Sequence, residues 1–134
     1  MINSQMVKDI LNAIGEGEYM GVSLPHLLGR FVGDFNQAAP NDIEKFIYHM
    51  DELFDAGLFK AKNLRPELGW GLSRGLGNQY EMLDTALVLT PIGGETFEEL
   101  KKSKGMEKLK QAMRSAGALA GTEALKYGIS ALLR

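Results

Sequence analysis

Apolar residues recur every three or four positions in several stretches of the chain, which is the spacing of an amphipathic helix. The first stretch predicts a helix over residues 4–14, which Asn3 or Ser4 can cap and Gly15 can end. A second helix is expected after Ser23, a residue type that favours helix N-termini, with Pro25 in its first turn. The N-terminal part of the chain is therefore predicted to be mainly helical.

The third periodic stretch is the most informative part of the sequence. Asn41 and Glu44 have the spacing of a capping box, so we expect a helix to begin there. Its buried face should consist of the apolar residues at helical spacing, which are Ile43, Phe46, Ile47, Met50, Leu53 and Phe54. Gly57 stands where a left-handed residue ends many helices. The segment "IYHMDELFDAGLFKA" thus predicts a helix that stops at a glycine and continues into a strand.

The remaining pattern predicts strands and then further helices. "LFKAK" and "ALVLT" are strand-like and are expected to pair antiparallel, with a long glycine-rich connection between them. Thr90 and Pro91 favour the start of another helix, and a last helix should follow Gly117. This order predicts a mainly α, α+β fold: a winged helix-turn-helix domain over residues 1–99, with a two- to three-stranded antiparallel wing, and a C-terminal helical extension over residues 100–134.

Two segments of the chain carry a resemblance to a known family. "IYHMDELFDAGLFKA", followed after the wing by "LVLTPIGGETFEEL", resembles the layout of a small winged-helix family of unknown function that is common in phages and prophages. The resemblance covers about residues 1–105, and the last helix also looks similar. It implies a fold rather than a chemistry. The chain departs from the family pattern at "LTPIGGETF", where a proline and a second glycine are expected to loosen the start of the helix.

The sequence offers little for catalysis. The absence of cysteine excludes disulfides, thiolate nucleophiles and thiolate metal sites. His26 and His49 fall on different predicted helices, and neither has a second ligand at metal-binding spacing. Ser73 lies in a Gly-x-Ser-x-Gly pattern that lacks the preceding strand and the following helix. We therefore expect no enzyme activity, no catalytic or metal-binding residues and no cofactor.

The N-terminal segment and the overall hydropathy bear on location. The first residues mix acidic and polar side chains with apolar ones, unlike a signal peptide. The chain also has no run of about eighteen apolar residues that could span a membrane. We expect a cytoplasmic protein without a membrane span.

Charge is distributed unevenly along the chain. Residues 40–59 hold five acids and one base, and residues 80–99 hold five acids and no base. Residues 60–79 hold four bases and one acid, and residues 100–134 hold eight bases and two acids. Because lysine and arginine supply most of the affinity for phosphates, a nucleic-acid surface would have to come from the two basic segments.

Two candidate contact surfaces follow from these charges. The outward face of the third helix is acidic, which handicaps contact with DNA and favours a solvated or protein-binding face. Its candidate partner contacts are Asn41, Asp42, Glu44, Lys45, Tyr48, His49 and Glu52. The wing is basic, and its candidate contacts with nucleic acid or an acidic protein are Lys60, Lys62, Arg65, Trp70 and Arg74. Trp70 is expected either to fold back onto the core or to anchor a partner.

The C-terminal segment is basic first and apolar afterwards. Its bases are expected either to bind phosphate or anionic lipid or to solvate a packed helix, and they include Lys101, Lys102, Lys104, Lys108, Lys110 and Arg114. The last helix carries a stripe of small and large apolar residues that is the first candidate for self-association as a homodimer. This stripe comprises Gly121, Leu125, Gly128, Ile129 and Leu132.

Two hypotheses for function result from these patterns. The first is a non-enzymatic winged-helix interaction module of phage or prophage type, which contacts another host or phage protein as a regulator or inhibitor of a host system. The alternative is a DNA-binding transcriptional regulator that uses the basic wing and the C-terminal segment.

Overall fold

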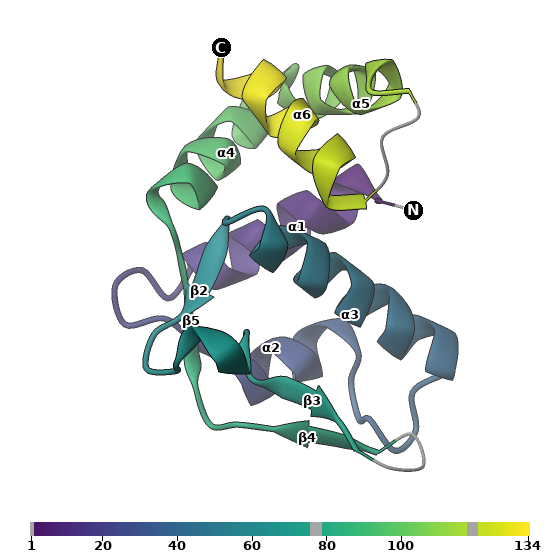
Figure 1. Ribbon diagram of the computed structural model, residues 1–134, viewed down its shortest axis with the longest axis vertical. Helices are drawn as coiled ribbons and strands as arrows, with labels where there is room; N and C mark the ends of the chain where they lie inside the picture. Colours follow the sequence, from purple (N-terminus) through teal and green to yellow (C-terminus); the bar gives the residue numbers. More distant parts are fainter. Residues whose placement is uncertain (1, 76–78, 118–120) are drawn as a thin grey trace.

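Helices make up most of the chain in the computed structural model, which describes residues 2–75, 79–117 and 121–134 (Figure 1). The elements in chain order are α1 (Ser4–Gly15), β1 (Val22–Ser23), α2 (Leu24–Phe31), α3 (Pro40–Asp55), β2 (Phe59–Ala61), the 3-10 turn η1 (Pro66–Leu68), β3 (Leu72–Arg74), β4 (Tyr80–Met82), β5 (Ala86–Leu89), α4 (Pro91–Lys101), α5 (Gly105–Ser115) and α6 (Gly121–Leu133). The fold is therefore mixed α and β and mostly helical, with small antiparallel sheets.

The starts of the first three helices test the predicted caps. The Asn3 and Ser23 side chains accept backbone N–H bonds at the starts of α1 and α2, as predicted. Helix α3 instead begins at Pro40 and has no side-chain cap, so the predicted capping box of Asn41 and Glu44 is wrong. Proline suits the first helical position because its fixed φ is already helical and its missing N–H would be unpaired there anyway.

Strand β5 lies in the middle of a three-stranded antiparallel sheet with the order β1–β5–β2. Phe59 of β2 lies opposite Leu89 of β5, which confirms the predicted pairing of the two strand-like segments. The long connection between them contains η1 and a separate hairpin, in which Arg74 of β3 lies opposite Tyr80 of β4. Residues 76–78, between β3 and β4, lie outside the described residues.

The end of α3 and the start of α4 are joined tightly. Gly57 adopts a φ of 78° and ends α3, as the sequence predicts. The Thr90 hydroxyl donates to the Gly57 carbonyl at 2.5 Å. A Cβ at Gly93 would lie 1.8 Å from the Leu58 carbonyl oxygen, so glycine is required for this approach. The expected loosening of the helix at Pro91 is therefore wrong.

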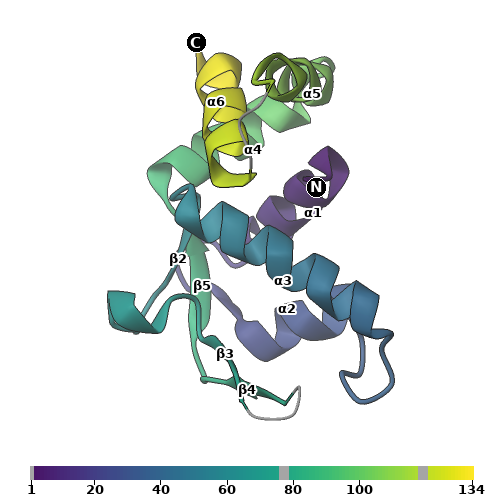
Figure 2. The same ribbon diagram turned by 45° about the vertical axis from the view of Figure 1, so that its right-hand side comes forward.

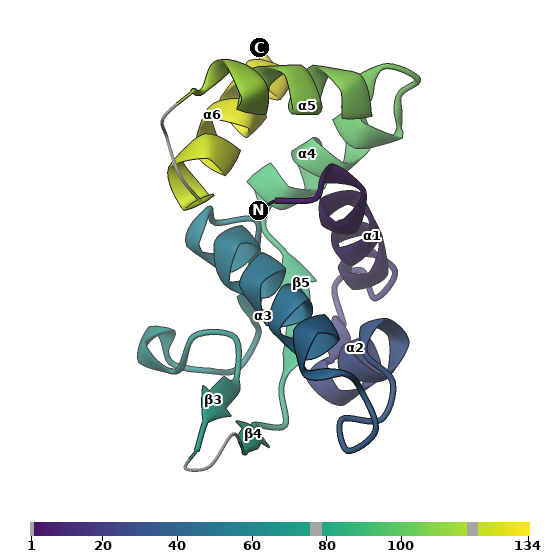
Figure 3. The ribbon, with the colours of Figure 1, turned by 90° about the vertical axis from the view of Figure 1, so that its right-hand side faces the viewer.

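The three C-terminal helices share one hydrophobic core with the rest of the chain. The same buried cluster contains Val7 of α1, Phe46 of α3, Leu100 of α4 and Leu125 of α6. Figure 1 shows α4, α5 and α6 at one end, α1 to α3 in the middle and the β3–β4 hairpin at the other end, and Figures 2 and 3 show the same order. The boundary predicted after residue 99 falls inside α4.

Candidate interaction surface of helix α3 and the hairpin

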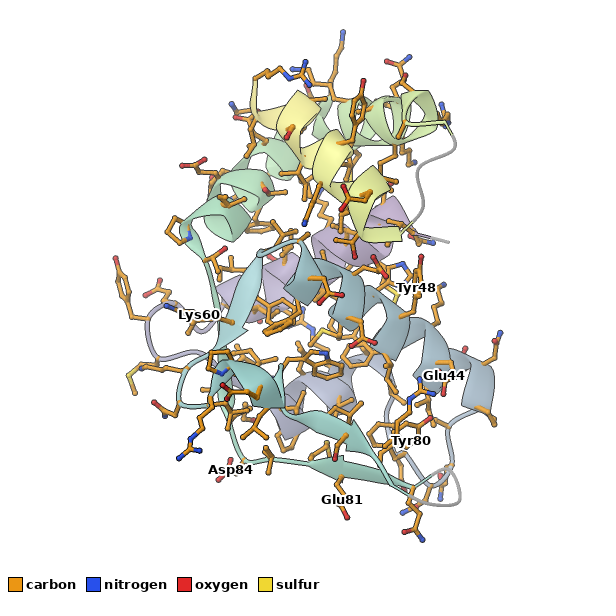
Figure 4. The ribbon with its side chains drawn as sticks, viewed as in Figure 1. Glu44, Tyr48, Lys60, Tyr80, Glu81 and Asp84 are labelled. Carbon is orange, nitrogen blue, oxygen red and sulfur yellow. The ribbon has the colours of Figure 1, made fainter. Side chains whose placement is uncertain are left out.

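The β3–β4 hairpin is bonded to the first half of α3 through one carboxylate (Figure 4). Glu44 Oε1 accepts a hydrogen bond from the Tyr80 hydroxyl at 2.7 Å, and Oε2 accepts one from Arg74 Nη2 at 2.6 Å. The hydrogen bonds from Tyr80 and Arg74 lower the pKa of the Glu44 carboxyl. Glu44 and Arg74 were expected on two separate binding surfaces, but they bind each other.

The second half of α3 contains a buried histidine. His49 is only 1% exposed, so the expectation that it faces outward is wrong. Its Nε2 accepts the backbone N–H of Asn3 at 2.8 Å, which leaves Nδ1 as the donor to the Lys45 carbonyl, also at 2.8 Å. Burial lowers the pKa of the His49 imidazole. His49 is therefore a neutral structural residue that holds the start of α1 against α3.

Trp70, which follows η1, also faces inward. It is 4% exposed, and its ring packs edge-on against Phe46 with the ring centroids 6.4 Å apart. Its Nε1 donates to Asp51 Oδ1 at 2.8 Å, and desolvation raises the pKa of that carboxyl against the opposing effect of the hydrogen bond. Of the two alternatives for Trp70, the structure shows the fold-back onto the core. Its assignment as an exposed wing contact is wrong.

A third acid of α3 is used by the last helix. Glu52 accepts a hydrogen bond from the Thr122 hydroxyl of α6. Together with the two carboxylates above, three of the five acids of α3 bind groups in other elements. Asp42 and Asp55 are exposed and their side chains form no hydrogen bond among the described residues, and Asp51 is exposed as well. Much of the acidic character that distinguishes this helix in the sequence therefore serves contacts within the chain.

The accessible remainder of the predicted α3 surface lies mostly in the first turns of the helix. Asn41, Asp42 and Lys45 are exposed, and Tyr48 is half-buried. The Tyr48 ring stands edge-on to that of His49 at a centroid distance of 5.5 Å, and burial raises the pKa of its hydroxyl. These four residues form the candidate surface on α3 together with Glu44 and its two hairpin donors, a contact that we call the clasp.

The bases predicted for the wing do not gather into one cluster. Lys60 on β2 and Arg65 before η1 are exposed. The Lys62 ammonium donates to the backbone carbonyl of Tyr19 at 3.0 Å. Since Arg74 is bound to α3, the predicted basic wing keeps only Lys60 and Arg65 without a side-chain hydrogen bond among the described residues.

The hairpin instead presents acidic and apolar side chains, which the sequence analysis did not assign to the wing. Glu81, Met82, Leu83 and Asp84 are all exposed on or just after β4. Figure 4 labels Glu81 on β4 and Asp84 just after it, at the end of the molecule that carries the hairpin. The signal was present in the acid count of residues 80–99, but only the strand pairing places these acids beside α3.

The apolar stripe of α6 is packed inside the molecule. Leu125, Ile129 and Leu132 belong to the core. An added Cβ at Gly128 would come within 2.8 Å of a side chain of α5, so this glycine serves close helix packing. Gly121 is the first residue of α6. The expectation that this stripe is a free self-association face is therefore wrong.

The bases of the C-terminal segment divide into two sets. Three of them form ion pairs with the glutamate three residues earlier, namely Lys101, Lys102 and Lys110. Lys104, Lys108 and Arg114 are exposed on or next to α5. Lys108 and Arg114 border an open groove of about 700 Å³ between α5 and α6. This basic end lies opposite the acidic hairpin in Figure 1.

The turn between α1 and β1 holds the most exposed large apolar residues of the described chain. Tyr19 and Met20 are 91% and 78% exposed. The sequence analysis did not select them. The available signal was the pair of glycines around "EYM", which indicates a tight turn with its middle residues directed outward.

Comparisons of the chain with models of protein families, with curated proteins and with solved structures found no match. No helix among the described residues has the length and apolar character needed to cross a bilayer. Within the same residues, no group of three His, Asp or Glu side chains is arranged to hold a metal ion.

Proposed function

We propose that the first three helices, the three-stranded sheet and the hairpin form a winged helix-turn-helix domain. The order α1–β1–α2–α3–β2–hairpin–β5 supports this arrangement, as does the central position of β5 between β1 and β2. In this interpretation α3 occupies the place of the recognition helix and the β3–β4 hairpin is the wing.

We further propose that this domain is a non-enzymatic interaction module of phage or prophage type that acts through protein contacts. Its role would be to regulate or inhibit a host system. The observation that carries the proposal is the composition of the α3 and hairpin end. Asp42, Glu81 and Asp84 are exposed there, while the nearest hairpin base, Arg74, is held by Glu44.

The physical reason is electrostatic and hydrophobic. In a winged helix that binds DNA, both α3 and the wing approach phosphates, so exposed carboxylates on both elements oppose binding. Apolar side chains between carboxylates suit a protein partner instead, because interface cores are formed by apolar contacts within a polar rim. Met82 and Leu83 lie between Glu81 and Asp84 in this way.

The second candidate function is DNA binding through surfaces away from α3. Lys60, Arg65 and the exposed bases of α5 support it, because they leave a positive surface that α3 does not provide. A regulator of this kind would contact phosphates chiefly through α5 and would read little sequence with α3.

Fluorescence anisotropy with random duplex DNA across a salt series separates the two functions. If the domain acts through protein contacts, the full chain should show no binding at physiological salt and at most weak binding at low salt. Tight binding whose affinity falls steeply with salt would overturn the proposal. The slope of log affinity against log salt concentration reflects the number of phosphates that the protein neutralises. Arg65→Ala would then be expected to weaken binding.

The protein-contact surface is tested by cross-linking pull-down from a host lysate. A partner of the hairpin should be captured by the wild-type chain and lost with Glu81→Lys/Asp84→Lys. It should be retained by Glu107→Lys/Glu123→Lys, which makes the same charge change on α5 and α6. Equal capture by all three proteins would reject the hairpin as the contact surface.

A further inference from the structure

The turn over residues 16–21, between α1 and β1, displays a tyrosine and a methionine side by side. The side chains of Tyr19 and Met20 are almost fully solvated, unlike the other large apolar residues of the described chain. Tyrosine is enriched among residues that dominate binding energy, and methionine adapts to irregular apolar pockets. The pair has the composition of an interface anchor.

Side chains from two other elements hold this turn in place. At its base, Arg30 of α2 forms an ion pair with Glu16 at 2.7 Å. Near its tip, the ammonium of Lys62, the residue after β2, donates to the Tyr19 carbonyl at 3.0 Å. The two anchor residues are thus presented by a turn that is tied to both α2 and the sheet.

The backbone of the turn is also closely packed. An added Cβ at Gly17 would lie 2.4 Å from the carbonyl of Gly21, so the turn closes only with glycine at residue 17. Glu18 has a φ of 49°, the only positive value of a non-glycine residue in the described chain. Such a conformation is kept only where the surrounding structure imposes it. A pre-ordered turn loses less conformational entropy when it binds.

A groove lies on the same flank of the molecule as the turn. It is open, has a volume of about 560 Å³ and runs between α4 and the end of α6, lined by Pro91, Gly94, Glu95, Glu98, Glu99 and Leu133. Ile92, at the start of α4, is 50% exposed. Figure 1 shows the turn and the start of α4 at the left edge of the molecule, and Figure 3 shows that they are offset along the depth of the Figure 1 view.

The charges beside the turn and the groove are opposite. Lys60 is exposed on β2, and Figure 4 shows it on the left side of the molecule, where the turn also lies. Three glutamates line the groove, and two of them pair with lysines of their own helix. Glu95 is exposed and forms no ion pair among the described residues.

We propose that this flank is the interface of a symmetric homodimer, in which the Tyr19–Met20 turn of each chain docks into the α4–α6 groove of the other. A two-fold interface uses the same surface on both chains, so an anchor and its receptor must lie on one flank. Here an apolar anchor beside a lysine and a groove with glutamates satisfy that requirement. The interface is distinct from the hairpin surface, so the dimer and the proposed function are tested by different residues.

Sedimentation equilibrium of the full chain tests the dimer. Over roughly 1–200 µM, a range in which interfaces of modest quality dissociate, the mass should rise toward twice the 14.7 kDa of one chain. Tyr19→Ser/Met20→Ser should weaken association at least about tenfold, because it removes both anchors. Met82→Ser/Leu83→Ser, the matched change of two exposed apolar residues on the hairpin, should leave it unchanged. A wild-type chain that stays monomeric, or a loss with the hairpin variant alone, overturns the proposal.

A charge exchange tests the docking geometry. Lys60→Glu and Glu95→Lys should each weaken the dimer by about tenfold, and the two changes together in one chain should restore it, because each new pair keeps opposite charges across the two-fold axis. Circular dichroism of each variant checks that the fold is retained. If the double variant dimerises as weakly as the single variants, the turn does not dock into this groove.

Discussion

Helices α3 and α6 each carry a stripe that the sequence assigns to the surface, and the structure uses both stripes for contacts within the chain, the α6 stripe by burial and the α3 acids by hydrogen bonds at the surface. The apolar stripe of α6 enters the common core, where contact is non-directional and any apolar surface can serve. Three of the acids of α3 accept specific hydrogen bonds: Glu44 from two donors of the hairpin, Asp51 from Trp70 and Glu52 from α6. An apolar stripe therefore predicts that a helix face is buried, although it does not predict what covers that face. An acidic face does not show which of its carboxylates form hydrogen bonds within the chain.

Truncation of the α6 stripe should have the largest effect. Leu125→Ala removes a fully buried side chain from the core, and we expect the free energy of unfolding to fall by about 2–5 kcal/mol because a cavity is left. Urea denaturation followed by circular dichroism measures the change. Lys126→Ala, on the exposed face of the same helix, is the control and should change stability by less than about 0.5 kcal/mol. A similarly small effect of Leu125→Ala would mean that α6 does not belong to the core.

On α3, the buried imidazole should matter next. His49→Leu leaves the Asn3 N–H without its acceptor, so we expect a loss of about 1–3 kcal/mol near pH 7.5. In the wild type, burial lowers the pKa of His49 below its ordinary value of about 6.5. As the pH falls below about 6.5, His49 becomes protonated in the unfolded chain before it does in the folded chain. The contribution of the neutral His49 to the free energy of unfolding is therefore fully present above about pH 6.5 and is lost as the pH falls toward the lowered pKa.

Unfolding measurements at about pH 7.5 and pH 5.5 in both proteins isolate this effect. The difference in stability between wild type and His49→Leu should shrink at the lower pH. Asp51 acts in the opposite direction, because its raised pKa lets the folded state take up a proton first, but this contribution is common to both proteins. A difference that does not depend on pH would contradict the buried neutral imidazole.

Local signals in the sequence predict much of the fold. Asn3 and Thr90 cap the starts of α1 and α4, and the left-handed Gly57 follows the end of α3, so each can be recognised from a few neighbours. The capping box at Asn41 failed because Pro40 takes the first helical position, which puts the cap at Ala39, two residues earlier than predicted.

The candidate site depends instead on pairs that are distant along the chain. Arg74 and Glu44 are 30 residues apart, and Thr122 and Glu52 are 70 apart. The spacing of nearby residues does not predict such a bond, because it forms only when the sheet and the helical core bring the two elements together. For this reason the charge count of α3 did not reveal that three of its acids bind groups of the same chain, and Glu81 and Asp84 were not selected as contacts of the wing.

The chain's only tryptophan allows a direct test of the α3 contacts. Since Trp70 is buried, its fluorescence should be shielded from acrylamide in the native state and become accessible on unfolding. Trp70→Phe removes the donor to Asp51 and should cost at least about 0.5–1.5 kcal/mol. Asp51→Asn is the matched control, because it keeps an oxygen acceptor and removes the desolvated charge, so a smaller effect is expected. Native-state quenching as strong as that of the unfolded chain would place Trp70 in solvent.

The clasp between the hairpin and α3 should give the smallest effect. The Glu44 and Arg74 side chains are 46% and 58% exposed, so solvent screens their attraction, and Glu44→Gln should cost about 0.5 kcal/mol or less. A double-mutant cycle with Arg74→Met measures the coupling, which should decrease further at high salt. A coupling well above about 1 kcal/mol that is insensitive to salt would show a rigid clasp. If the proposed protein partner offers a base to Glu44, it would compete with Arg74 at little cost, while the Tyr80 hydroxyl would still hold the hairpin to α3.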